Sequence, residues 1–139
     1  MSLRRWKNQQ KVQVLNAEGQ VLHSDVLIAD SFLTRLRGLL GRAGLTEGEG
    51  LLIMRCREIH MWFMRFPIDA VFLRQVDRND SEHWEVRGLF ENLPPWKVLP
   101  VGVRDSEVTL ELRAGSVRKK AWTVGQKVRL REGGASCID

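Results

Sequence analysis

The sequence contains only two cysteines, Cys56 and Cys137, and no apolar run of membrane-spanning length. Two cysteines make a poor disulfide framework, so we expect free thiols and a cytoplasmic location. A signal peptide already removed would leave no trace in such a sequence. A membrane span needs ~20 consecutive apolar residues, so we expect no membrane partner. The nucleophile elbow, the phosphate-binding loop and the Cys-x-x-Cys pair are also missing, which argues against the enzyme and metal-site classes they mark.

The net charge of +5 raises the question of a nucleic-acid partner. The basic residues are scattered, however, and Arg118–Lys120 form the one internal run, which is typical of a solvated turn. We therefore expect no nucleic-acid partner, and a monomer or weak dimer. The 139 residues, 43% of them hydrophobic and 28% charged, predict one soluble domain over residues 1–139. Its ordered core should cover about residues 11–131, between a flexible N-terminal arm and a flexible C-terminal tail.

Alternating polar and apolar residues predict several short strands. Lys11–Leu15 and Gln20–Ala29 flank a turn and should form a hairpin. Further strands are expected over residues 51–54, 69–76, 84–90, 108–112 and 127–131. Apolar residues three and four positions apart predict one short helix near residues 31–41. The predicted fold is mainly β, with α+β at the margin: a compact β-sandwich or jelly-roll-like domain, or a small barrel, with that one helix.

The stretch Cys56–Leu73 holds charged side chains inside an apolar strand pattern. Both sides of the predicted strand are largely apolar, so it should be buried on both faces or line a pocket. Pro67 cannot donate a hydrogen bond to a sheet, so the chain must bend, bulge or run at an edge there. Arg65 and Asp69 flank this bend, and opposite charges in apolar surroundings need each other or a ligand. We therefore predict that their charged groups converge on a shared hollow.

Phe63–Asp69 (FMRFPID) is the densest part of a longer pattern. The pattern also includes Arg35–Leu40, Glu49–Ile53, Cys56, Ile59–His60, Val71–Leu73, Val108–Leu112, Ala114–Gly115 and Gly125. On these residues the chain resembles the domain-of-unknown-function family 192, a widespread prokaryotic group. Met61 stands where the family pattern has threonine, and Gln126 where it has an acidic residue. The resemblance implies a compact β-sandwich or jelly-roll-type domain with a small helical part, and it brings no catalytic residues with it.

One candidate function is a non-catalytic binding domain for a small molecule, a glycan or a peptide. Its site would combine an apolar wall with a few convergent polar groups. The candidate residues are His60, Arg65, Asp69, Glu111, Trp62 and Trp96. Glu111 belongs to this set only if it faces inwards, because its alternation with apolar neighbours is typical of a solvent-facing residue on a half-buried strand.

The alternative is a metal-independent hydrolase or lyase. His60 would act as the base and is the candidate catalytic residue. Arg65 would clamp an anion, and Asp69 would orient either His60 or Arg65. Cys56 and His60 would lie ~13 Å apart on a regular strand, which is too far for both to bind one metal ion. We therefore expect no metal and no other cofactor.

Overall fold

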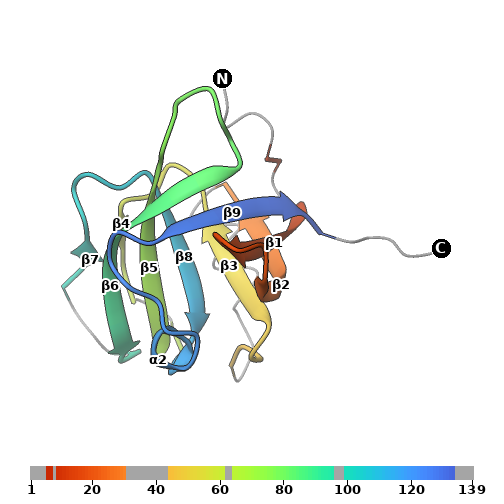
Figure 1. The fold of residues 1–139 in the computed structure, drawn as a ribbon. Coiled ribbons are helices and arrows are strands. Elements are labelled where there is room, and N and C mark those ends of the chain that lie inside the picture. Colours follow the sequence, from red (N-terminus) through yellow and green to blue (C-terminus); the bar gives the residue numbers. More distant parts are fainter. Residues whose placement is uncertain (1–5, 8, 31–43, 62–63, 96–98, 134–139) are drawn as a thin grey trace.

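The strands of the protein form a closed barrel, with a two-stranded sheet beside it (Figure 1). The computed structural model describes residues 6–7, 9–30, 44–61, 64–95 and 99–133. The barrel strands are β1 (Lys11–Asn16), β2 (Val21–Ala29), β3 (Glu49–Ile53), β5 (Ile68–Gln75), β6 (His83–Leu93), β8 (Val108–Arg113) and β9 (Lys127–Glu132). They follow the order β1-β2-β3-β8-β5-β6-β9, and the small sheet pairs β4 (Glu58–Ile59) with β7 (Val101–Gly102).

Of the predicted folds, the small barrel is the one that forms, and mainly β is confirmed. β1 and β2 make the predicted hairpin, and β5 and β6 make a second one. β9 pairs with both β6 and β1, which closes the barrel. Closure pairs every strand of this sheet on two sides, so none of them is left as an open edge.

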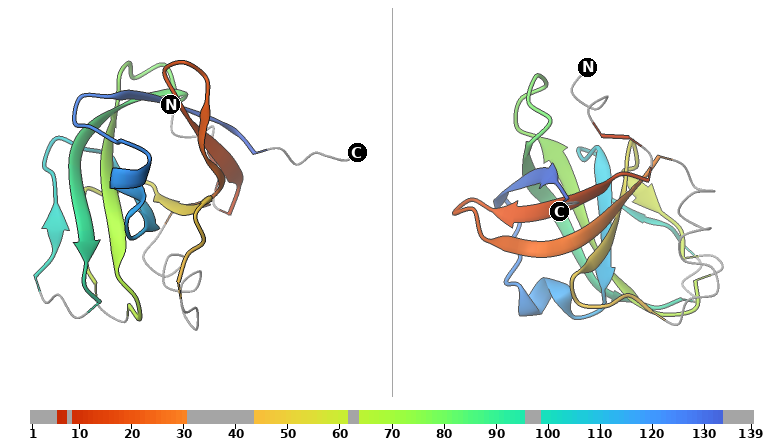
Figure 2. Two further views of the ribbon diagram at one scale, coloured as in Figure 1. Left: turned by 60° about the horizontal axis from the view of Figure 1, so that its bottom comes forward. Right: turned by 90° about the vertical axis from the view of Figure 1, so that its right-hand side faces the viewer.

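Two features of the connections were not predicted. β2 and β3 pair in parallel, an arrangement that needs a long crossover, here residues 30–48. The helix predicted near residues 31–41 lies outside the described residues. A different short helix, α2 (Ser116–Lys119), follows β8 and lies across the ends of β5 and β8 (Figure 2, left). No helix in the described ranges is long and apolar enough to cross a membrane.

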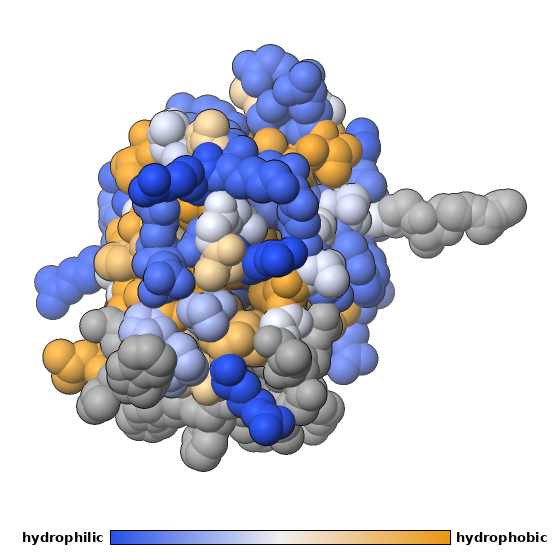
Figure 3. Space-filling view, turned by 90° about the horizontal axis from the view of Figure 1, so that it is seen from below, coloured by the Kyte–Doolittle hydropathy of each residue, from blue (hydrophilic) through white to orange (hydrophobic). Residues whose placement is uncertain are grey.

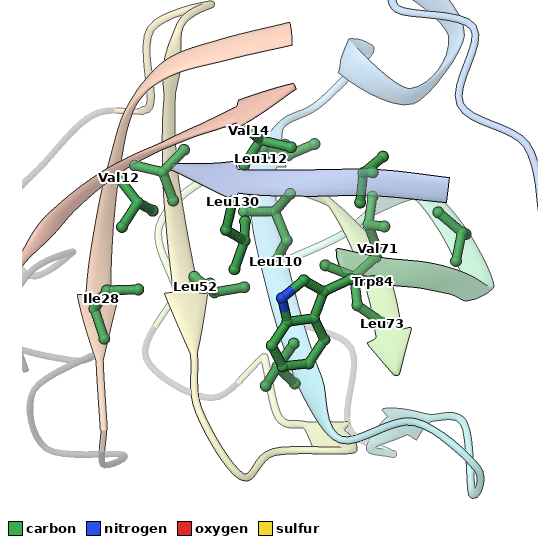
Figure 4. Packing of buried hydrophobic residues seen from close by; sticks show 14 of the residues in the cluster. Val12, Val14, Ile28, Leu52, Val71, Leu73, Trp84, Leu110, Leu112 and Leu130 are labelled. Carbon is green, nitrogen blue, oxygen red and sulfur yellow. The ribbon is translucent and has the colours of Figure 1, made fainter. Parts of the chain in front are cut away.

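An apolar cluster fills the interior of the barrel (Figure 4). Alternate residues of each strand point inwards, as Leu110 and Leu112 of β8 do. Trp84 of β6 is completely buried there, and its indole N–H donates a hydrogen bond to the carbonyl of Ser81 at 2.8 Å. Because side chains fill the lumen, a ligand site must lie at an end of the barrel or on its outside.

A second apolar cluster covers the outer face of β3, β5 and β8. Ala70 and Phe72 of β5 belong to it, together with Ile59 and Met61 from the segment before β5. Strands β5 and β8 are therefore buried on both faces over most of their length. A polar residue on the outer face of these strands is shielded from water as fully as one inside the barrel.

The strand predicted within Cys56–Leu73 ahead of Pro67 is not continuous in the described residues. Among the described residues of this segment only Glu58–Ile59 pair as a strand, and the backbone N–H of Met64 donates to the carbonyl of Met61 at 3.2 Å. The segment is apolar on both sides because it covers the outside of the barrel, not because it lies within a sheet. Pro67 directly precedes β5, a position at a strand start that proline can occupy.

Candidate functional site

Asp69 of β5 has a completely buried carboxylate that accepts hydrogen bonds from the backbone. Its Oδ1 accepts the N–H of Asn92 at 2.7 Å, and its Oδ2 accepts those of Gly115 at 3.0 Å and Val117 at 2.9 Å. A carboxylate is tolerated away from water when charge-assisted hydrogen bonds replace its hydration. Asp69 therefore joins the end of β6 to the segment that connects β8 with α2.

The local backbone is shaped for this junction. Ile68 of β5 pairs with Leu93, and Ala70 pairs with Phe90, so two residues of β6 stand opposite Asp69. This β-bulge leaves the Asn92 N–H available to the carboxylate, and bulges are common beside functional sites. Asn92 has φ +52° and Gly115 has φ +97°, both in the left-handed region that asparagine and glycine tolerate best.

A hollow of 580 Å³ lies over the junction. Its described lining consists of Asp69, Glu91, Asn92, Ala114, Gly115, Arg118 and Lys119. The Arg118 side chain is 86% exposed, and its Nε lies 3.8 Å from the carboxylate of Glu91. Figure 3 looks onto this end of the molecule, where hydrophilic residues cover much of the described surface. We refer to this feature as the α2 hollow.

Basic and acidic side chains alternate around the α2 hollow. The Lys119 ammonium lies 2.6 Å from the carboxylate of Glu47, and Lys120 lies 4.0 Å from it. The hydrogen bond and charge of Lys119 hold the pKa of Glu47 below its usual range, and Lys120 and Arg113 act in the same direction. With Arg118, these make four basic side chains at this end of the barrel among the residues that the structure describes. An anionic group that enters the hollow can compete with these exposed carboxylates for the basic side chains.

Arg65 and Asp69 do not come together, so their predicted convergence is wrong. Arg65 is exposed, whereas the carboxylate of Asp69 is buried and bonded to three backbone N–H groups. The physical reason is that β5 begins at Ile68, which separates Asp69 on the strand from Arg65 in the covering segment. The backbone of the two turns, and not a guanidinium, meets the hydrogen-bonding need of the carboxylate.

Glu111 is completely buried, so the expectation of a solvent-facing position is wrong. It lies on the outer face of β8, where its neighbours on the adjacent strands are Leu51 of β3 and Ala70 of β5. Both of these belong to the second apolar cluster. The alternation of β8 correctly places Glu111 on the face opposite the barrel interior. The covering layer then shields that face from water.

His60 lies in the covering segment, half-buried, with its Nδ1 shielded from solvent. Cys56 is a free thiol whose Sγ donates to the carbonyl of Glu58 at 3.1 Å. Neither residue lines the α2 hollow. Trp62 and Trp96 lie outside the described residues. Of the predicted site residues that the structure describes, Asp69 alone lines this hollow.

Sequence reasoning missed Asn92, Glu91, Arg118 and Lys119 as lining residues. One usable signal was present, because the basic run Arg118–Lys120 follows the Ala114–Gly115 turn directly. That run was assigned to a solvated turn. No short-range pattern places Asn92 beside it, since the β-bulge that does so depends on the pairing of β5 with β6.

Fold and site together define a small closed β-barrel domain with a hollow at one end whose described lining includes charged side chains. The particular family follows from its sequence pattern. The model of the DUF192 family, described as an uncharacterized ACR, matches residues 13–130, and the chain belongs to this family. The resemblance noted in the sequence is thus confirmed.

Two solved structures are similar to the chain. One is a proposed transcription regulator from Sinorhizobium meliloti 1021, with 25% identity over 88% of this chain and 92% of that one, and a TM-score of 0.66. The other is a protein of unknown function from Novosphingobium aromaticivorans DSM 12444, with 22% identity over 85% of this chain and 82% of that one, and a TM-score of 0.66. Comparison with curated proteins gave no match.

Proposed function

We propose that the protein is a non-catalytic binding domain that takes a small organic anion in the α2 hollow. The observation that supports this most is the construction of the hollow, with a floor fixed by buried Asp69 and a rim that carries exposed Arg118. Its volume of 580 Å³ lies within the range of small-molecule sites. The described lining offers charge and hydrogen bonds, which are the means of binding.

Arg118 is the principal anion-binding group in this proposal. Its contact with Glu91 is long, at 3.8 Å, and the side chain is 86% exposed. An exposed pair of this kind contributes only about 0–1 kcal/mol, so a ligand can replace it at little cost. A guanidinium presents parallel N–H donors that match a carboxylate or a phosphate group. The preferred ligand therefore carries at least one such group.

The fixed floor adds affinity by reducing what must be ordered on binding. Asp69 holds the backbone of Asn92 and Gly115 before any ligand arrives. A site that is already ordered loses less conformational entropy when it is occupied. The amide side chain of Asn92, at the edge of the hollow, adds a donor and an acceptor for the uncharged part of a ligand.

The wider setting is compatible with this role. The Sinorhizobium meliloti protein is described as a proposed transcription regulator, and a regulator can employ a domain that senses a small molecule. The free thiol of Cys56 supports a cytoplasmic location. Phosphorylated and carboxylated metabolites are present there as ligands. Glycan and peptide ligands are the competing outcomes of the test below.

Binding to the α2 hollow should depend on Arg118 and on the Asn92 side chain. We expect inorganic phosphate, citrate or glucose 6-phosphate to raise the melting temperature, and uncharged glucose to leave it unchanged, because only the native state binds. Arg118→Ala should weaken binding of the effective anion by about tenfold, the loss expected for one charge-assisted contact. Asn92→Gly should weaken it while keeping the fold, because glycine accepts φ +52° and retains the N–H that Asp69 binds.

Isothermal titration of each variant with the effective anion provides the measurement. Lys127→Ala is the matched control, since Lys127 is also exposed and ion-paired, at 3.7 Å from Glu85. It should bind as the wild type does. Equal affinities in wild type, Arg118→Ala and Asn92→Gly would place the site elsewhere. Stabilisation by glucose as large as that by glucose 6-phosphate would point to a glycan.

A further inference from the structure

Three exposed arginines line two adjoining hollows near the small β4–β7 sheet. One hollow, of 460 Å³, is lined by Arg57, Glu58, Pro100, Gly102, Val103 and Arg104. The other, of 260 Å³, is lined by Arg55, Arg57, Ser106 and Glu107. Arg57 lines both, so the two hollows meet at its side chain and together form one arginine-bearing surface feature. We call it the arginine groove.

The arginines of the groove are not tied directly to carboxylates within the described part of the chain. Neither Arg55, Arg57 nor Arg104 forms an ion pair there. The guanidinium of Arg57 instead donates to the backbone carbonyl of Arg104 at 3.4 Å. By contrast, nearby Arg87 is tied to Asp105 at 2.6 Å. An arginine cluster without carboxylate partners is a recognised means of holding acidic or phosphorylated motifs.

The backbone beneath these arginines is firmly held. The N–H of Val103 donates to the carbonyl of Arg57 at 3.0 Å, and the N–H of Cys56 donates to that of Glu107 at 2.8 Å. Gly102 permits this close approach, because a Cβ there would lie 2.4 Å from the carbonyl oxygen of Arg57. The two segments that carry the arginines are thus packed backbone against backbone, and the groove is present before any partner binds.

The groove is not uniformly positive, and this decides between classes of partner. Glu58 and Glu107 share its lining with the arginines. The carboxylate of Glu107 already accepts the N–H of Gln75 at 2.8 Å and stays in place. A nucleic-acid backbone offers acceptors alone and would be repelled at these two positions. A peptide with acidic side chains offers both carboxylates for arginine and backbone N–H donors for glutamate.

We propose that the arginine groove docks an acidic peptide segment of a partner protein. Carboxylates of the segment engage Arg57 and Arg104. The segment also has backbone N–H donors, which a polyphosphate chain lacks. This site is separate from the α2 hollow, because Glu107 precedes β8 and Ala114 follows it. The six residues of β8 span about 20 Å at ~3.4 Å per residue. The two sites can be occupied and tested independently.

Fluorescence anisotropy with fluorescein-labelled hexaglutamate tests the proposal directly. The full-length protein should bind this probe, and raising the salt concentration should weaken binding. Arg57→Ala and Arg104→Ala should each lower the affinity at least tenfold. Arg57→Lys should restore only part of it, since an ammonium lacks the planar fork. Exposed Arg131, which contacts Gln13, supplies the control Arg131→Ala with unchanged affinity.

Two competitors complete the experiment. A labelled dodecathymidylate that binds more tightly than hexaglutamate and loses affinity in Arg57→Ala would overturn the peptide assignment in favour of nucleic acid. Hexaglutamate affinity equal in wild type, Arg57→Ala and Arg104→Ala, or no binding at all, would also overturn it. Arg118→Ala should bind hexaglutamate with unchanged affinity. A wrong assignment of the α2 hollow and a wrong assignment of the arginine groove therefore give different results.

Discussion

Replacing Asp69 with alanine is expected to lower the free energy of unfolding by about 4 kcal/mol, near the upper end of single-residue effects. The substitution removes three hydrogen bonds to one buried charge, at 2.7, 3.0 and 2.9 Å. Hydrogen bonds to charged groups contribute roughly 1.5–3 kcal/mol each, and bonds to a shared carboxylate do not add in full. Three backbone N–H groups would be left without their acceptor, which adds to the cost.

Urea unfolding followed by circular dichroism measures this loss. Asp25→Ala is the control, because Asp25 is also an aspartate on a barrel strand but forms an exposed contact with Lys11. It should cost less than about 1 kcal/mol. The loss of unfolding free energy in Asp69→Asn should lie between these two values. Its amide oxygen can still accept a hydrogen bond, whereas its NH₂ group faces N–H donors. A loss below about 1.5 kcal/mol for Asp69→Ala would show that the junction is held by something else.

The same substitution bears on function through the α2 hollow. Without the carboxylate, the backbone at Asn92 and Gly115 has no common anchor, although both residues keep their left-handed conformations at some cost. The affinity of the folded molecules for the effective anion should therefore be lower in Asp69→Ala, and in the milder Asp69→Asn, than in the wild type, even after correction for the unfolded fraction. Two stretches that carry the family resemblance, Phe63–Asp69 and Ala114–Gly115, thus meet at one hydrogen-bonded junction.

Much of the barrel could be predicted because its strands carry local signals. The alternation in β1, the turn before β2 and the polar residues between β5 and β6 each depend on neighbours in the sequence. The β1–β2 hairpin and the strands of the second hairpin followed directly from these patterns. The parallel pairing of β2 with β3 did not, since a crossover leaves no short-range mark on the strands that it joins.

The candidate site was harder to predict because its contacts join distant parts of the chain. The donors to Asp69 lie 23, 46 and 48 residues away, and the sequence offered Arg65 only four positions off as an apparent partner. Glu111 was misjudged for a related reason. The period of β8 identifies its face, but only the tertiary structure shows that the covering segment removes this face from water.

His23 should make the protein lose about 3 kcal/mol of stability between pH 6.5 and pH 4. It is completely buried and stacks on Trp122, with ring centroids 6.0 Å apart. Burial, aided by the charge of Lys120, lowers the pKa of His23 to about 4, while the carbonyl and the carboxylate of Glu47 oppose the shift. A fall of about 2.5 units from the ordinary value of 6.5 corresponds to roughly 3 kcal/mol.

The sign follows from proton binding in the two states. Between pH 6.5 and about 4 the unfolded chain binds a proton at His23 that the native state does not, so acid favours unfolding in this window. His23→Phe keeps a ring against Trp122 and removes the titration, so its urea midpoint should fall by correspondingly less over the same range. It should stay close to the wild type in stability at pH 7, because neither ring nitrogen of His23 reaches full hydrogen-bond geometry within the described structure, although the carbonyl of Glu47 lies near enough to raise its pKa. Parallel pH profiles for wild type and His23→Phe would mean that another group governs acid stability.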